Sequence, residues 1–241
     1  MSKRSLSKWG KYKVMRKASA LRPYLPQTAW FKPEALRVML SEYGDVIVKP
    51  TGGWGGRGVV RVRLRSSGAY DVQAGSSRRT LHSESALIAY LRKHAGSHAI
   101  VQQRIRLAAV GGCPFDCRVM VQRRPKGEWR VTGKLAKVAG KGYVVTNVRR
   151  SQGRIVSLEK AVRMSDIPGA STGALSALMD DVALQTARQL RKAYPSKRTI
   201  GLDLAVDRDG RVWIIEANFT PMLGLFRKLK DRSMYRTILS Y

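Results

Sequence analysis

One stretch near the C-terminal end constrains the fold more than any other. Residues 201–218 contain two β-rich runs on either side of Asp209-Gly210. Asp-Gly between such runs is the strongest short-range signal for a β-hairpin, and it favours a two-residue type I′ turn. Across a turn of that length, facing positions add up to a constant number, so Asp203 lies directly opposite Glu216. The stretch therefore predicts an antiparallel hairpin whose register is set by its turn.

The two faces of this hairpin differ in chemistry. One face is apolar and is expected to point into the core; it carries Leu202, Leu204, Val206, Trp213 and Ile215. The other face carries Asp203 and Glu216, with Asn218 two residues further along. Two carboxylates opposite one another repel, so a positive group should lie between them. An all-oxygen set of this kind suits Mg²⁺, which proteins usually hold through one or two carboxylates together with substrate phosphates.

The alternative is an exposed hairpin whose acidic side chains are merely solvated. The composition argues for the metal interpretation, because only 16 Asp and Glu residues stand against 46 Lys and Arg in 241 residues. The formal net charge of +30 implies an anionic partner, which could be a nucleotide, a nucleic acid, an acidic polymer or an anionic surface. The length suffices for one large domain or for two small lobes with proper cores.

Targeting and redox features are few. The N-terminus is basic but no apolar run follows it, so no signal peptide is expected, and no segment approaches the ~20 apolar residues of a membrane span. We therefore expect a cytoplasmic protein. Cys113 and Cys117 are too few for a disulfide framework or a cysteine-only zinc site, and both should be reduced thiols. The three histidines are interpreted as structural or surface residues.

A glycine-rich segment follows a short predicted strand at Asp45–Pro50. Its glycines are Gly52, Gly53, Gly55, Gly56 and Gly58. Residues 53–58 match the dinucleotide pattern G-x-G-x-x-G, but a strand and not a helix is expected at 59–64, and the P-loop ending is absent. We expect a flap between two strands whose N–H groups can close over phosphates, with Lys49 reaching them as a point charge. A flexible surface hairpin with an incidental lysine is the alternative.

The remaining pattern alternates helices and strands. Helices are expected at 8–20, 33–43, 83–94 and from Ser171 or Thr172 to Tyr194, and strands at 99–105, 116–122 and 129–138, with a basic, partly helical tail at 223–241. This order predicts an α+β fold in two lobes, residues 1–105 and 106–241, with a cleft between them.

Taken in order, these pieces resemble the ATP-grasp superfamily. The resemblance rests on Val48-Lys49-Pro50 with its flap, Asp116-x-Arg118, Asn147-Val148-Arg149, Gly201-x-Asp203 and Glu216-x-Asn218-x-x-Pro221. Within the superfamily the chain looks most like the YheC/YheD endospore coat-associated group, and its second lobe is similar to ligases that add glutamate to a protein C-terminus. The implied fold is the ATP-grasp fold, with the nucleotide in the cleft between the lobes, and the implied location includes the spore.

The resemblance also implies roles for individual residues. Lys8 and Lys49 would hold ATP phosphates under the glycine flap, and Gln103 and Ile105 would meet adenine through backbone groups. Asp203, Glu216 and Asn218 would hold Mg²⁺. Arg118, Asn147 and Arg149 would face the phosphoryl group or the acceptor. From the residues alone, Arg118 could equally pair with Asp116 or line a solvated face, and Arg149 could belong to the general basic surface.

The implied activity is that of a Mg²⁺- and ATP-dependent carboxylate–amine ligase acting through an acyl phosphate on an anionic peptide or polymer. Two departures from the family pattern bear on its substrate. Pro221 is followed by Met222 where Gly is usual, and only 48 residues precede Lys49, so we expect the substrate-binding domain of most relatives to be missing or supplied by another chain. Two other classes remain open. One is a kinase-like phosphotransferase, although no His-Arg-Asp or Asp-Phe-Gly motif occurs, and the other is a non-enzymatic, basic coat or nucleic-acid-binding protein.

Overall fold

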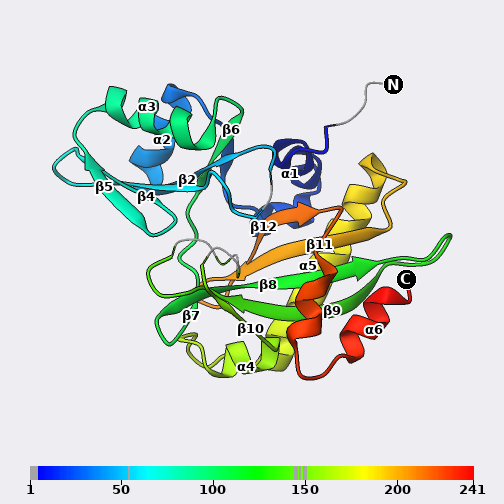
Figure 1. Cartoon of the computed structure of the whole chain (residues 1–241). Helices are drawn as coiled ribbons and strands as arrows, with labels where there is room; N and C mark the ends of the chain where they lie inside the picture. The colour runs from blue at the N-terminus through cyan, green and yellow to red at the C-terminus, as the bar shows by residue number, and fades with distance from the viewer. Residues whose placement is uncertain (1–4, 54, 144–145, 147, 149–150) are drawn as a thin grey trace. The chain divides into compact units, whose positions relative to one another are not determined.

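The computed structural model describes residues 5–53, 55–143, 146, 148 and 151–241, which form two compact units (Figure 1). The first unit contains residues 1–25, 106–138 and 153–241, and the second contains 26–105 and 139–152. This division differs from a single boundary after residue 105 in two places: the first 25 residues group with the C-terminal part, and 139–152 group with the N-terminal part. The α+β class predicted from the sequence is confirmed.

The second unit is built on an antiparallel sheet with the strand order β1-β6-β2-β3-β4-β5. Its strands are β1 (Thr28–Trp30), β2 (Asp45–Pro50), β3 (Val60–Leu64), β4 (Tyr70–Ala74), β5 (Ser77–Leu81) and β6 (Ala99–Gln103). β2 and β3 pair directly, with Val48 opposite Val60, so the glycine-rich segment connects two adjacent strands as expected. β4 and β5 were not predicted, because their alternation is weak and β5 is polar except for Leu81.

Two helices supply the core of the second unit. α2 (Pro33–Tyr43) has Pro at its start and ends at Gly44, whose φ of +65° is the left-handed conformation that glycine adopts without steric cost. α3 (Glu84–Ala95) is capped by Ser83, whose hydroxyl accepts from Ala86 N. The core combines apolar side chains of these helices with those of one sheet face, including Leu36, Leu40, Leu87, Leu91, Val46, Val48, Val60, Val62, Val72 and Val101.

The first unit has a second antiparallel sheet with the order β10-β9-β8-β11-β12, and a short strand β7 beside β8. Its strands are β7 (Ala109–Val110), β8 (Cys113–Gln122), β9 (Arg130–Val138), β10 (Arg154–Val156), β11 (Thr199–Val206) and β12 (Val212–Asn218). β11 is an interior strand: it pairs with β8 on one side and with the edge strand β12 on the other.

Helices cover one face of this sheet. The long helix α5 (Thr172–Ala193) begins at its predicted cap, Ser171, and packs Met179, Val182 and Leu190 into the core. α1 (Lys8–Arg16) and α4 (Leu158–Arg163) contribute to the same core. α1 is shorter than predicted, because a 3₁₀ helix, η1 (Ser19–Tyr24), replaces its last turn. Within the described residues, no helix is both long and apolar enough to cross a membrane.

The C-terminal tail covers part of the opposite sheet face. It consists of the 3₁₀ helix η2 (Leu223–Lys228) and the helix α6 (Ser233–Leu239), drawn in red against β9 in Figure 1. Phe226 and Ile238 pack onto Met120 and Leu135 in a small separate core. Gly133 on β9 makes room for this contact, since a Cβ there would lie 2.8 Å from the Phe226 ring. The tail therefore needs both a large aromatic residue and a glycine beneath it.

The hairpin of β11 and β12 has a different turn from the one predicted. Asp207 O accepts from Gly210 N at 3.1 Å, and Asp207 N donates to Arg211 O at 3.0 Å, so the loop has three residues, 208–210. Gly210 has φ +79°, as required for a type I turn that ends in a glycine bulge. The Asp207 carboxylate stabilises the loop by accepting from the backbone N of Asp209 and of Arg211. The prediction of a two-residue type I′ turn was wrong.

A bulge in β12 restores the predicted pairing further along the hairpin. After the longer turn, Leu204 faces Ile214; the register then shifts by one residue, so that Asp203 does face Glu216 and Gly201 faces Asn218. The shift also changes which side chains of β12 enter the core. Val212 and Ile214 belong to that core, whereas Ile215 and the buried Trp213 lie outside it. Trp213 donates its indole N–H to Asp207 at 2.7 Å instead.

The small core under the tail generates a stability prediction. Phe226→Ala should lower the free energy of unfolding by about 3–5 kcal/mol, because it removes a fully buried ring and leaves a cavity. Leu239→Ala in the same segment is the matched control, since Leu239 is 57% exposed and should change stability by less than about 0.5 kcal/mol. Chemical denaturation measures both. Equal losses in the two variants would contradict the packing described for the tail.

Candidate functional site

A row of charged side chains crosses three neighbouring strands of the first unit. Arg118 on β8 pairs in register with Asp203 on β11, which pairs in turn with Glu216 on β12. Arg118 donates to both carboxylate oxygens of Asp203, through Nε at 2.9 Å and Nη2 at 3.2 Å. Residues that share a register row project from the same sheet face. The acidic face predicted from the hairpin therefore continues onto β8 as a mixed ionic cluster.

Lys137 is the second cation that Asp203 contacts. Its Nζ donates a hydrogen bond to Asp203 Oδ1 at 2.8 Å. The same Nζ forms an ion pair with Asp116 Oδ1 at 3.0 Å. Register explains the meeting, because Lys137 on β9 is directly opposite Asp116 on β8. Asp203, Arg118, Lys137 and Asp116 are all buried. The cluster is thus a buried ionic network and not a solvated surface pair.

Burial and pairing act in opposite directions on the pKa of Asp203. Burial raises the pKa of this carboxyl, but the charges and hydrogen bonds of Arg118 and Lys137 outweigh it, and the pKa lies well below its ordinary value. Burial likewise lowers the pKa of Lys137, while Asp116 and Asp203 raise it, and the net direction is upward. Both side chains are therefore charged at neutral pH.

Helix α1 brings two more lysines to the same face. Lys8, in the first turn, places Nζ 3.5 Å from Glu216 Oε1. Lys11, one turn later, is buried and lies over the Phe219 ring. Burial lowers the pKa of Lys11, Glu216 partly offsets this, and Lys8 lowers it further. The Ser7 hydroxyl caps the helix by accepting from Gly10 N, which fixes the start of α1.

Asn218 completes the predicted metal set and is held near Asp203. Its Nδ2 lies 3.4 Å from Asp203 Oδ2, and its register partner is Gly201. A side chain at position 201 would collide with Pro221, at 2.5 Å from an added Cβ, and would press on Arg118 Cδ at 3.3 Å. Gly201 therefore allows Arg118 and Pro221 to approach the cluster.

The donor chemistry of this cluster fits a magnesium ion. Asp203, Glu216 and Asn218 offer carboxylate and amide oxygens on one face, which is the ligand type that Mg²⁺ prefers. Among the described residues, no three His, Cys, Asp or Glu side chains gather closely enough to hold a metal by themselves. The expected set includes an amide, and Arg118 and Lys137 already contact Asp203. An incoming cation would therefore compete with them for this carboxylate.

The second unit contains the residues predicted to hold phosphates. Lys49 on β2 is buried, and its Nζ donates to Gln102 Oε1 at 2.8 Å. Gln102 in turn donates to the hydroxyl of Thr28 at 2.9 Å, so Lys49 is held by a buried polar chain. A lysine held in this way on a strand next to the flap is positioned by its neighbours and not by solvent.

The flap has the backbone conformation that its glycines predict. Gly53, Gly55, Gly56 and Gly58 have φ between 71° and 78°. At Gly58 an added Cβ would lie 2.7 Å from Pro50 Cγ and 2.9 Å from His94 O, so a side chain is excluded there. A cavity of about 370 Å³ borders the flap; its lining includes Gly56, Gly58, the β4–β5 turn, His94 and Tyr143. Trp54 lies outside the described residues.

The other predicted site residues fall into two groups. Gln103 ends β6, and its N–H donates to Gln27 O at 2.8 Å, while Ile105 is half-buried just beyond the strand. Asn147 and Arg149 lie outside the described residues, so their assignment stays a prediction. The structure therefore gathers Lys8, Arg118, Asp203, Glu216 and Asn218 in the first unit, and Lys49, Gln103, Ile105 and the described flap glycines in the second.

Sequence reasoning missed Lys137 and Lys11 as members of the cluster. Lys137 follows Leu135 on the same face of β9, and Leu135 is core. The signal that could have identified it is the pairing of β8 with β9, which sets Asp116 opposite Lys137. The register of β8 and β9 shifts by one residue between Met120 and Val121, so counting residues outward from the turn that joins the two strands does not pair Asp116 with Lys137.

Comparison with known proteins identifies relatives of the whole chain. Residues 1–241 match the family model described as "YheC/D like ATP-grasp". The endospore coat-associated protein YheD of Bacillus subtilis (strain 168) is 27% identical over 240 residues, which cover 93% of this chain and 50% of YheD. The endospore coat-associated protein YheC of the same organism is 25% identical over 221 residues, covering 89% and 59%. The chain thus spans about half the length of these relatives.

Solved structures agree on the fold. The ATP-grasp ligase PsnB, solved with its minimal precursor, is 18% identical, with a TM-score of 0.55 over 98% of this chain and 61% of PsnB. The ADP complex of purK, N5-carboxyaminoimidazole ribonucleotide synthetase, is 17% identical, with a TM-score of 0.54 over 98% and 51%. At these identities the likeness establishes the architecture, and it confirms the ATP-grasp fold expected from the sequence.

The buried network predicts how much stability Lys137 contributes at neutral pH. Lys137→Met should lower the free energy of unfolding at pH 7 by about 3–5 kcal/mol, because it leaves Asp203 and Asp116 short of one buried cation. Lys134→Met is the matched control on the same strand, since Lys134 pairs with the half-exposed Asp180 and should cost about 1 kcal/mol or less. Denaturant titrations of both variants measure the difference.

The sign of the pH effect follows from the pKa of Asp203. A carboxyl whose pKa is lower in the folded than in the unfolded state stabilises the fold above its ordinary pKa of about 4, and this contribution disappears as the pH falls further. Without Lys137 that pKa is less depressed, so Lys137→Met should lose stability at a higher pH than the wild type. If the wild type and the variant lost stability at the same acidic pH, Lys137 would not be what keeps Asp203 charged.

Proposed function

We propose that this chain, which belongs to the YheC/D-like ATP-grasp family, is a Mg²⁺- and ATP-dependent carboxylate–amine ligase. The observation that carries the proposal is the charged row of Arg118, Asp203 and Glu216, with Lys137 and Lys8 beside it. It combines oxygen donors for a divalent cation with several cations for phosphate oxygens on one sheet face. The solved neighbours PsnB and purK, which hold ADP or AMPPNP, support this nucleotide.

Magnesium, when bound to Asp203, Glu216 and Asn218, would neutralise charge on the transferring phosphoryl group. Arg118 and Lys137 would hold Asp203 charged and oriented while it takes part in this set. Lys8 would leave Glu216 for a phosphate oxygen, since the two groups lie 3.5 Å apart and only partly shielded from water. All of these contributions are positioning and charge stabilisation, which is what phosphoryl transfer requires of a protein.

The second unit would bind the rest of the nucleotide. We assign the phosphates to Lys49 and to the N–H groups of the flap, since Lys49 places an amine donor, held by Gln102, on the strand that enters the flap. Adenine presents an amino donor next to a ring acceptor, which complements one backbone carbonyl and one backbone N–H. Because Gln103 N–H is already donated to Gln27, we assign the carbonyl to Gln103 and the N–H to Ile105.

The proposed reaction proceeds in two steps. A carboxylate oxygen of the donor attacks the γ-phosphorus, the bond to ADP breaks, and an acyl phosphate forms. An amine then attacks the acyl carbon, inorganic phosphate leaves with the former carboxylate oxygen, and the amine loses a proton as the amide forms. Arg118, Asn147 and Arg149 are assigned to the phosphoryl group or the acceptor. Neither step requires a nucleophilic serine or cysteine.

The substrate is proposed to be an anionic peptide or polymer. The net charge of +30 would concentrate such a substrate around the protein. The neighbour PsnB, which has been solved with a precursor peptide, supports a peptide-like substrate. The curated relatives are named for the endospore coat, so an association with that structure is part of the proposal.

A substrate screen tests the activity. The full chain is incubated with Mg-ATP and with amino acids, peptides and acidic polymers, and ADP release is measured. We expect release to require Mg²⁺ and both a carboxylate and an amine, and isotope-labelled oxygen from the carboxylate to appear in phosphate. A stable phosphorylated product without an amide would instead indicate a phosphotransferase. Substrate-independent nucleic-acid binding that falls steeply with salt, without ATP turnover, would indicate a basic binding protein.

A pair of variants tests the metal set. Glu216→Gln should lower kcat by about 10²-fold or more, because it removes a carboxylate from the group that stabilises the phosphoryl transition state. Asp209→Asn removes an equal charge from the exposed turn of the same hairpin, and it should leave kcat within about twofold. Equal activity of both variants and the wild type would remove this face from the proposed active site.

A further inference from the structure

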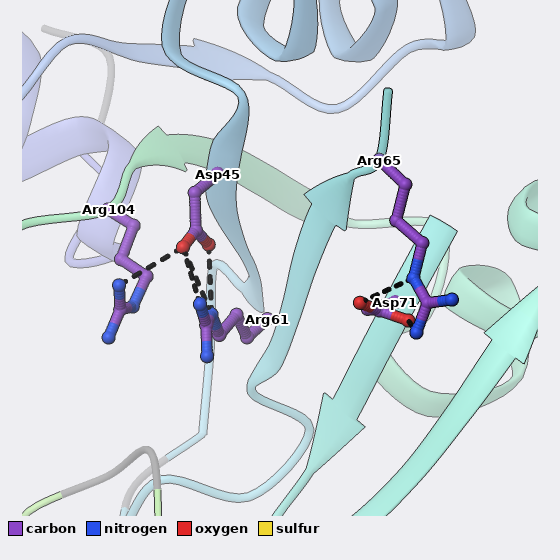
Figure 2. Close-up of polar contacts among 5 residues, drawn as sticks. All are labelled: Asp45, Arg61, Arg65, Asp71 and Arg104. Atoms are coloured by element: carbon purple, nitrogen blue, oxygen red, sulfur yellow. Dashed lines mark hydrogen bonds and ion pairs between the residues drawn. The ribbon is translucent and has the colours of Figure 1, made fainter. Parts of the chain in front are cut away.

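Asp45 is the acidic centre of a three-strand contact in the second unit. It begins β2, and Figure 2 shows guanidinium groups approaching its carboxylate from two sides. Arg61 on β3 donates Nε to Oδ1 at 3.0 Å and Nη2 to Oδ2 at 2.7 Å. Arg104, which follows the last residue of β6, donates Nη1 to Oδ2 at 3.0 Å. The carboxylate thus joins the start of one strand, its neighbour and the exit from a third.

A backbone hydrogen bond also connects Asp45 to Arg104. Arg104 N donates to Asp45 O at 3.3 Å, one step beyond the last pair of the β2–β6 ladder, Val46 and Gln103. On its other side, Gln103 N donates to Gln27 O. Asp45 therefore holds Arg104 by both main chain and side chain, at the point where the chain leaves the sheet and passes on to residue 106 of the first unit.

This arrangement differs from an ordinary surface ion pair. The Asp45 side chain is only 18% exposed, and two guanidinium groups share it. Removing its charge would take away the carboxylate that two neighbouring cations share. The pair of Asp71 and Arg65 in the same sheet, also drawn in Figure 2, joins one carboxylate to one arginine that is about half exposed. It supplies a natural comparison, because it has the same chemistry but lies at the β3–β4 turn.

We infer that Asp45 is a positioning residue for the nucleotide base, acting through Arg104. Arg104 lies between Gln103 and Ile105, the two backbone positions to which the proposed function assigns adenine, so the inference rests on that function. Asp45 itself does not touch the nucleotide. By holding residue 104 at two points, it keeps the carbonyl of residue 103 and the N–H of residue 105 in place before the base arrives. Pre-organised groups of this kind improve affinity because less conformational freedom is lost on binding.

Binding and kinetic measurements on the full chain test the inference. Asp45→Asn should weaken Mg-ADP binding, measured by titration calorimetry, and raise the KM for ATP by about tenfold, with kcat within about twofold. Arg104→Gln should have the same effect from the other side of the contact, and Arg104→Lys, which keeps a cation, should recover most of the affinity. Asp71→Asn is the matched control and should bind Mg-ADP like the wild type.

The outcomes separate the inference from the function on which it rests. If Asp45→Asn and Arg104→Gln bind Mg-ADP as tightly as Asp71→Asn, the positioning role is wrong and nucleotide binding stands. A fall in kcat with unchanged nucleotide affinity would likewise contradict it. If the wild type does not bind Mg-ADP at all, both the inference and the proposed function are wrong. Should Asp45→Asn fail to fold, as judged by circular dichroism, Arg104→Gln and Arg104→Lys decide the question, because they leave the Asp45–Arg61 pair intact.

Discussion

The geometry of the first unit depends on keeping Asp203 charged inside the protein. Taking a carboxylate out of water costs several kcal/mol, and only closely placed cations with good hydrogen bonds offset that cost. Arg118 and Lys137 meet this condition from two different strands. The register of β8, β9 and β11 is therefore tied to one side chain: a slip of one residue would separate the charges and turn them to the other face.

The face of the first unit's sheet that lies opposite α5 has two parts of different chemistry. At one end the C-terminal tail covers Met120 and Leu135 with apolar side chains. At the other end the same face carries the charged row, and the alternation of β8 continues without interruption from Met120 to Arg118 and Asp116. The tail therefore adds apolar packing on the part of the face that has no charge, and the charged row, with Arg118 and Asp116 buried, lies further along the same strands.

The sequence was sufficient where a local signal determines the structure. Ser171, Pro33 and Gly44 mark helix ends by their own side-chain and backbone preferences, and the structure has those ends. It was insufficient where two distant segments set the outcome. Lys137 was missed because its partner, Asp116, lies on another strand beyond a register shift. Trp213 and Ile215 were placed on the wrong face because the turn is one residue longer than Asp-Gly suggests. The facing of Asp203 and Glu216 was nevertheless correct, since the bulge in β12 compensates for that turn.

The two extra residues of this hairpin lie in separate places. The loop at residues 208–210 adds one position to the hairpin, and Ile215 adds one on the other strand before Glu216 is reached. A one-residue deletion in the loop would leave two residues between Asp207 and Arg211, which can still pair and keep every later pair in step. Removal of Ile215 would place Glu216 directly after Ile214, where it still faces Asp203. The alignment of the two carboxylates is therefore set by the strand ladder itself, and the exposed loop can change in length without disturbing it.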